Sequence, residues 1–207
     1  MPYSADHKAE TRQRIVSSAA HLLRAEGVPG TGVARVMKHA GLTHGGFYAH
    51  FKSKDDLIAA AFEEAVMDAG RNLTEGLDGM DAQEKLAHYI GRYLSRAHRD
   101  NPEHGCPLSS LGAELSRGGT SARQGFERGL LRLMKGLDQI LPEQLTGEVE
   151  PDISENDDLI SIMAMMVGGL VLSRAVADEE FSDRILRTTR RSALKMSDEA
   201  NLTGETS

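Results

Sequence analysis

The chain has 207 residues, 40% of them hydrophobic and 27% charged, which suits one or two small globular domains and excludes a disordered chain. A single cysteine excludes an intramolecular disulfide framework and a cysteine-rich zinc site, and without a secretory signal or an apolar run of about 18 residues we expect a soluble, cytoplasmic protein. The formal net charge of -7 divides into +3 over residues 1–56 and -10 over the rest, which indicates a nucleic-acid-binding end and a solubilising remainder.

Residues 1–56 place apolar side chains at helical spacing and show no alternating strand pattern. We expect helices over 8–26, 33–39 and 43–50. Gly27 and Gly41 follow the first two, where glycine suits a C-terminal cap or a turn with positive φ. A short helix, a glycine turn and a second short helix beginning at an N-cap threonine, Thr43, have the layout of a helix-turn-helix.

Four further helices are expected, each with a recognisable signal near its start. These signals are a serine followed by acids, an Asp-x-x-Glu capping box, a proline at the first helical position and, for the last, a strong 3.6-residue apolar period. A glycine-containing break at 76–79 separates the first two helices. The expected ranges are 54–73, 81–100, 107–117 and 120–141.

The C-terminal third begins with an acidic stretch, because residues 143–158 hold seven acids and no Lys or Arg. Such a stretch is expected to be a solvated loop. A helix over about 155–177 is apolar nearly all round, which is borderline for a membrane span and better explained by a partner subunit that covers it, with Gly168 and Gly169 allowing close approach. A last helix is expected over 182–196, followed by a disordered tail at 197–207.

The helix-turn-helix interpretation assigns a role to each polar side chain near the turn. Residues at the start of the second short helix would meet base edges, two glycines would let its backbone approach the groove, and the basic residues and first amides of the next helix would meet phosphates. In the alternative interpretation Phe47 and Phe51 are core residues, Tyr48 is a half-buried packing residue, and the histidines are surface residues without a function. The candidate DNA-binding residues are Thr31, Arg35, Thr43, His44, Gly45, Gly46, Tyr48, His50, Lys52 and Lys54.

The same stretch resembles a known family. The run Ala-Gly-Leu-Thr at 40–43 and the run Tyr-x-His-Phe-x-x-Lys-x-x-Leu at 48–57 look like the N-terminal DNA-binding domain of TetR/AcrR-type transcriptional regulators, and the resemblance covers about residues 10–57. Two positions depart from the family pattern. Gly32 replaces a small hydroxyl residue, which puts one DNA contact in doubt, and Met37 replaces a small alanine, which suggests a different packing angle between the two motif helices.

The resemblance implies an all-α protein with a three-helix DNA-binding domain, here residues 1–56, and a helical effector-binding and dimerisation domain, residues 57–196. It implies a homodimer formed by the helices at about 155–177 and 182–196, bound to two half-sites of a palindromic operator in double-stranded DNA. It also implies an effector that changes the spacing of the two reading helices. A repressor is favoured over an activator, because no separate activating domain is present.

Two sets of residues are candidates for effector recognition. Cys106 follows His104 by two residues and stands at a predicted helix start, which favours the nucleophilic thiolate and suggests an electrophile or redox sensor. Alternatively it is a small buried residue without reactivity. An apolar effector would instead contact aromatic and methionine side chains that fit core positions equally well, namely Tyr89, Tyr93, Phe126, Met134 and Met163.

Other classes of function have less support in the sequence. The chain carries no nucleophile-elbow, P-loop, dinucleotide-binding or zinc-protease motif, and no Glu-x-x-His pair of a di-iron bundle. We therefore expect neither an enzyme nor a cofactor or metal site, although a catalytic dyad of Cys106 and His104 is conceivable. A helical adaptor without DNA binding is the remaining alternative, and strong salt dependence of binding to duplex DNA would distinguish the two.

Overall fold

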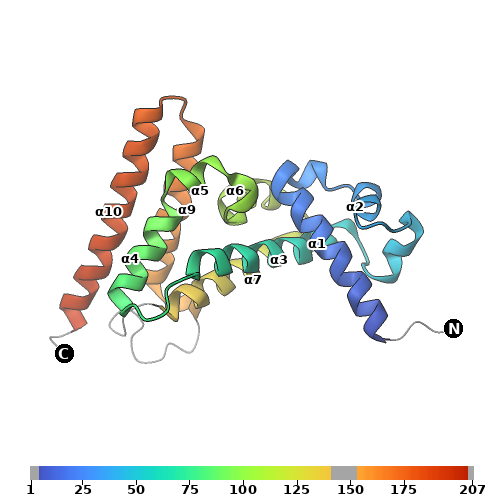
Figure 1. Ribbon diagram of the computed structural model, residues 1–207, viewed down its shortest axis with the longest axis horizontal. Coiled ribbons are helices and arrows are strands. Elements are labelled where there is room, and N and C mark those ends of the chain that lie inside the picture. The colour runs from blue at the N-terminus through green and yellow to red at the C-terminus, as the bar shows by residue number, and fades with distance from the viewer. Residues whose placement is uncertain (1–4, 141–152, 205–207) are drawn as a thin grey trace. The chain divides into compact units, whose positions relative to one another are not determined.

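The computed structural model describes residues 5–140 and 153–204, which form helices joined by short connections and contain no strand (Figure 1). The prediction of an all-α fold is confirmed. The α-helices are α1 (Ala5–Gly30), α2 (Val33–His39), α3 (Lys54–Thr74), α4 (Ala82–Tyr93), α5 (Arg96–Asp100), α6 (Pro107–Leu115), α7 (Thr120–Asp138), α9 (Asp157–Ala175) and α10 (Glu179–Gly204), and the 3-10 helices are η1 (His44–Ala49), η2 (Pro102–His104) and η3 (Ile153–Glu155).

The helices group into two compact units. The first comprises Met1–Asp68 and Cys106–Gly129, and the second comprises Ala69–Gly105 and Leu130–Ser207. The division falls inside α3 and inside α7, and it places α6 with the N-terminal helices. The predicted domain boundary at residue 56 lies inside the first unit, and it stays a prediction.

The first unit packs α1, α2, η1 and the first part of α3 around an apolar core. Its interior is aliphatic apart from three phenylalanines, because the chain has few aromatic residues. The largest fully buried side chains there are Ile15, Leu23, Met37, Phe47, Leu57, Ile58, Phe62 and Leu115. The contribution of Leu115 shows that α6 closes this core.

Most of the predicted start signals operate as expected. The Ser53 hydroxyl accepts a hydrogen bond from the Asp56 amide at 3.0 Å, which caps α3. Asp81 and Glu84 form a complete capping box at α4. Pro107 stands in the first turn of α6, and Gly41 has the predicted left-handed backbone with φ 69°. These local rules were sufficient because each involves only neighbours in sequence.

Two helices differ from their predicted form. The segment expected as a helix over 43–50 is a 3-10 helix, and the Thr43 hydroxyl makes no capping hydrogen bond. A run this short with two adjacent glycines lacks the propensity for an α-helix. The helix expected over 81–100 is broken after Tyr93, because Ser95 caps a new helix by accepting the His98 amide at 3.1 Å.

The ends of the C-terminal helices also differ from the prediction. Helix α7 ends at Asp138, and most of the acidic stretch lies outside the described residues. Helix α10 begins earlier than expected, because Asp178 accepts the Phe181 amide at 2.6 Å as an N-cap, and it continues to Gly204 instead of ending near Met196. The residues after 204 lie outside the description.

In the second unit α9 and α10 lie side by side (Figure 1). A Cβ added at Gly169 would lie 2.7 Å from Thr189 of α10, so this glycine serves packing within the chain, whereas the sequence predicted close approach of a partner. Among the described residues nothing approaches the Gly168 position within 4 Å. Helix α9 keeps Leu172 58% exposed, so the chain alone does not cover it all round.

Among the described residues α9 is also the one helix that is long and apolar enough, by length and composition, to cross a membrane. The mean hydropathy of its 18 most apolar consecutive residues is 1.5, and 39% of them are buried within the chain.

Candidate nucleic-acid interface

The 3-10 helix η1, predicted to contact bases, is held in place by aromatic packing beneath it. Phe47 is 1% exposed and stacks on Phe51 with ring centroids 5.7 Å apart. The left-handed Gly41 turns the chain between α2 and η1, and the Leu42 amide donates to the Met37 carbonyl at 2.8 Å. The alternative interpretation is therefore correct for the two phenylalanines, which form the floor under the exposed face of η1.

The outer face of η1 presents short polar groups and one aromatic ring. Thr43, His44 and Gly45 are exposed, and no atom of the described residues lies within 4 Å of a Cβ built at Gly45. Tyr48 is 71% exposed, so it is not the half-buried packing residue of the alternative interpretation. A ring this exposed contributes little to the core and is available to a partner.

Met37, which departs from the family pattern, is accommodated by the small residue Gly46. A Cβ at Gly46 would lie 3.6 Å from the Met37 methyl carbon, so the glycine faces α2. The long methionine fills the space between α2 and η1 that a smaller residue would leave. At the other departure, Gly32 occupies the N-cap of α2 and supplies no side-chain capping bond.

Helix α1 brings arginines to the interface that the sequence interpretation did not single out. The Arg12 guanidinium lies 4.8 Å from the centroid of the Phe51 ring, a cation–π contact. Arg14 donates to the Ala40 carbonyl at 2.7 Å and so caps the C-terminal end of α2. The spacing of four residues between Lys8 and Arg12 indicated that both lie on one face of α1. Only the fold shows that this face lies beside His50.

His50 lies at the centre of this positive charge. Its Nδ1 is buried and has no hydrogen-bond partner among the described residues. Burial, followed by the nearby charges of Lys8 and Arg12, lowers the pKa of His50 below its ordinary value of 6.5. The imidazole is therefore neutral near pH 7, and the positive charge around it comes from α1 and from exposed Lys52.

Three predicted contact residues instead have partners within the protein. Thr31 is fully buried and donates its hydroxyl to the Gly27 carbonyl at 2.8 Å. Arg35 forms a two-armed ion pair with Glu26.

Lys54, the third of these residues, donates its Nζ to the Val28 carbonyl at 3.1 Å. With Thr31 and Arg35 it braces the connection between α1 and α2, which is a structural role close to the interface.

A carboxylate of α6 completes that brace. Glu114 accepts the Val28 amide at 2.7 Å, just beyond the Gly27 kink in α1, where φ is 72°. A Cβ at Gly27 would lie 2.8 Å from both carboxylate oxygens. Sequence reasoning missed Glu114, because the contact joins residues that lie far apart in the chain.

The predicted effector residues are divided between the two units. Cys106 and Phe126 belong to the first, and Phe126 stacks on Phe62 with centroids 5.3 Å apart. Cys106 is 1% exposed at the N-cap of α6, whereas His104, in the second unit, is exposed.

The remaining four predicted effector residues belong to the second unit, and all are buried there. They are Tyr89, Tyr93, Met134 and Met163.

An exposed helix-turn-helix on an apolar floor, flanked by cations and joined to a helical second unit, defines a DNA-binding transcriptional regulator of the helix-turn-helix class. Residues 15–61 match the family model of bacterial regulatory proteins of the tetR family. Residues 82–189 match the tetracyclin repressor-like C-terminal domain. The chain therefore belongs to the TetR family, whose members are transcriptional regulators and not enzymes.

Comparison with individual proteins supports the same assignment. The chain is 31% identical over 96 residues to the HTH-type transcriptional regulator YerO of Bacillus subtilis, and the match covers 44% of this chain and 33% of YerO. The reduced form of Escherichia coli NemR has a similar fold with TM-score 0.67 and 20% identity, covering 88% of this chain and 96% of NemR. Bacillus subtilis FadR in complex with stearoyl-CoA has TM-score 0.56 and 24% identity, covering 89% and 96%.

Proposed function

We propose that this regulator is a cytoplasmic repressor that binds a palindromic operator as a homodimer and is released by a small effector. The observation that carries the proposal is the exposed face of η1, where Thr43, His44 and 71% exposed Tyr48 stand above a buried aromatic floor. Major-groove recognition requires short polar groups at the start of the second motif helix. Family membership supports the repressor role and the dimer.

We expect different residues to contact the bases and the phosphates. Thr43 and His44, with Gly45 allowing close approach, would face base edges. Tyr48 and Lys52 would hold phosphates on the same side. Phosphate contacts supply affinity that depends on salt, whereas base contacts supply specificity.

The dimer would form through the exposed face of α9 and α10. Leu172 and Phe181 are 58% and 52% exposed, and a groove of about 890 Å³ runs between them and Ile185. Large apolar side chains that are this exposed are typical of an interaction surface. A second copy of the same face would cover both helices.

Effector release has two candidate routes, which the names of solved relatives illustrate. FadR was solved with stearoyl-CoA and NemR in a reduced form. In this chain an apolar ligand would be recognised by the buried aromatic and methionine residues of the second unit. An electrophile would instead react with Cys106, whose burial requires that the start of α6 opens first.

The experiment that tests DNA binding is fluorescence anisotropy on the duplex that flanks the coding region, with a scrambled duplex as competitor. Tyr48→Phe and Lys52→Gln should weaken binding several-fold, while the control Lys135→Gln, an exposed lysine of the second unit, should not. Binding that is insensitive to salt would contradict the proposal. Equal effects of Lys52→Gln and Lys135→Gln would refute the assignment of the interface.

The two effector routes are separated by a thiol reagent. If Cys106 is the sensor, N-ethylmaleimide or a quinone should dissolve the protein–DNA complex of the native chain and leave that of Cys106→Ser intact. A complex that resists the reagent in both proteins would make Cys106 structural and favour an apolar ligand.

A further inference from the structure

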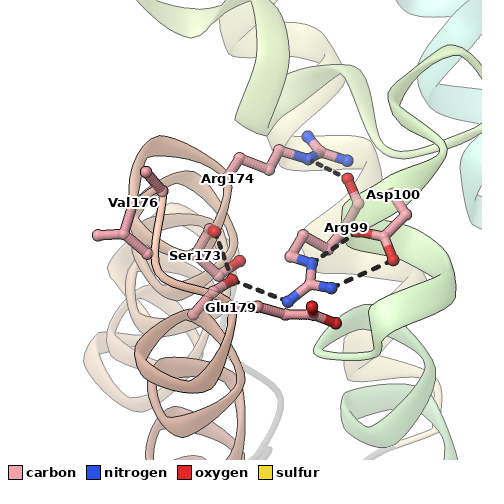
Figure 2. A pocket seen from close by; sticks show the side chains of 8 residues that line it. Arg99, Asp100, Ser173, Arg174, Val176 and Glu179 are labelled. Atoms are coloured by element: carbon pink, nitrogen blue, oxygen red, sulfur yellow. Dashed lines mark hydrogen bonds and ion pairs between the residues drawn. The ribbon is translucent and has the colours of Figure 1, made fainter.

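A polar cavity of about 250 Å³ lies in the second unit, where α5 faces the connection between α9 and α10 (Figure 2). Two arginines from different helices border it, Arg99 from α5 and Arg174 from α9. The lining is completed by short or charged side chains, namely Asp100, Ser173, Val176, Ala177, Glu179 and Ser182. None of these residues has a role in DNA recognition or in the apolar effector set.

The guanidinium of Arg99 is fixed on one side by α10. Its Nη1 donates to the Ser182 hydroxyl at 2.8 Å and to the Asp183 carboxylate at 3.0 Å. Ser182 in turn donates to the Ser173 carbonyl at 2.6 Å, and the Arg99 side chain is only 10% exposed. The cation is therefore held in one orientation before any ligand arrives.

Arg174 is fixed in the same way at another edge of the cavity. Its Nε donates to the Arg99 carbonyl at 3.1 Å, and its Nη2 donates to the His98 carbonyl at 2.7 Å. Figure 2 shows its side chain extending across the cavity from α9 toward α5. Two backbone carbonyls therefore hold this guanidinium in one orientation beside the cavity.

The other edge of the Arg99 guanidinium, formed by Nε and Nη2, is paired with the carboxylate of the next residue, Asp100. Asp100 accepts the Nε of Arg99 at 2.6 Å and its Nη2 at 3.2 Å, the two-armed geometry in which arginine recognises carboxylates and phosphates. The Asp100 side chain is 55% exposed, so it can turn into solvent. A neighbouring side chain therefore occupies the position that an external anion would take.

We propose that this cavity binds a small anion bearing a carboxylate or phosphate group, which replaces Asp100 on the Nε and Nη2 edge of Arg99. The exchange is possible because Asp100 can turn into solvent while both guanidinium groups stay fixed. A volume of about 250 Å³ admits a ligand of only a few atoms beyond the anionic group. Glu179 also lines the cavity, so a singly charged carboxylate is favoured over a phosphate dianion.

Thermal unfolding and calorimetric titration of the 207-residue chain test this site without DNA, so failure of the DNA-binding proposal would leave the result intact. The probes are sodium acetate, sodium benzoate and inorganic phosphate, each compared with sodium chloride at equal ionic strength. An anion that binds only the folded protein stabilises it and therefore raises the Tm. Asp100→Asn, which keeps the shape but loses the competing charge, should lower the Kd of the anion at least tenfold.

Two further variants complete the design. Glu179→Gln removes the other lining carboxylate and should strengthen binding two- to fivefold, while Glu180→Gln, its exposed neighbour outside the lining, should leave the Kd unchanged. Stabilisation by the carboxylates alone identifies a carboxylate site, and stabilisation by phosphate as well identifies a general anion site. The proposal is wrong if no anion raises the Tm of the native protein or of Asp100→Asn more than chloride does. It is also wrong if Asp100→Asn leaves the Kd of the anion unchanged.

Discussion

Replacement of Gly27 by alanine tests whether α6 braces the DNA-binding helices. Gly27 has φ 72° at the kink of α1, and the Glu114 carboxylate occupies the space that a Cβ would need, 2.8 Å away. The substitution therefore forces two changes together. The backbone must adopt a conformation that disfavours alanine, and Glu114 must move away from the Val28 amide, which it accepts at 2.7 Å.

The expected loss of stability follows from these two changes. Gly27 combines φ 72° with ψ -172°, a backbone region that essentially only glycine adopts, and a residue with a Cβ pays about 1–3 kcal/mol there. Loss of a hydrogen bond between an amide and a charged acceptor costs about 1.5–3 kcal/mol. We expect Gly27→Ala to lower the free energy of unfolding by about 3 kcal/mol, which for a chain of this length lowers the Tm by roughly 10 °C.

Circular dichroism during thermal and urea unfolding measures this loss, with two controls. Gly41→Ala has a similar φ of 69° but meets only an ordinary contact, Arg14 at 3.5 Å, so it should show the cost of a positive φ without the clash. Glu114→Ala should lose the hydrogen bond alone, and the double variant with Gly27→Ala should lose less than the sum. A loss for Gly27→Ala no greater than that for Gly41→Ala, or strict additivity with Glu114→Ala, would refute the brace.

Three further predictions concern single positions. Lys52→Gln should reduce the slope of log K against log salt for DNA binding by about 1 in magnitude, as measured by anisotropy, and an unchanged slope would remove Lys52 from the phosphate contacts. Burial lowers the pKa of His98 in the folded protein below its ordinary value of 6.5. The buried neutral imidazole therefore costs no stability above pH 6.5, and the free energy of unfolding falls as the pH drops from 6.5 toward the pKa of the folded protein. His98→Gln should therefore flatten the pH dependence of the free energy of unfolding below pH 6.5, and a slope equal to that of the native protein would contradict this cause. Gly169→Ala should cost about 1–3 kcal/mol in urea unfolding, because its Cβ would meet Thr189 at 2.7 Å, whereas Gly168→Ala should be neutral or slightly stabilising; equal effects would contradict the packing of α9 on α10.

The candidate site was only partly readable from the sequence. The exposed residues Thr43, His44 and Tyr48 followed from the spacing of a helix-turn-helix, which depends on neighbours in sequence. The roles of Thr31 and Arg35 did not, because a threonine or an arginine beside a turn can face solvent or brace the turn equally well. Only the position of their partners, the Gly27 carbonyl and Glu26, decides between the two.

The sequence by itself determined the all-helical class, the starts of most helices and the position of the short helix η1, since apolar periodicity, caps and glycine turns depend on residues that are close in sequence. The tertiary structure decided the contacts between distant segments. It placed Glu114 against the Gly27 kink and gathered Arg99 and Arg174 around one cavity. Such contacts depend on how helices pack, and a carboxylate or a guanidinium has the same sequence pattern whether it faces water or a partner far along the chain.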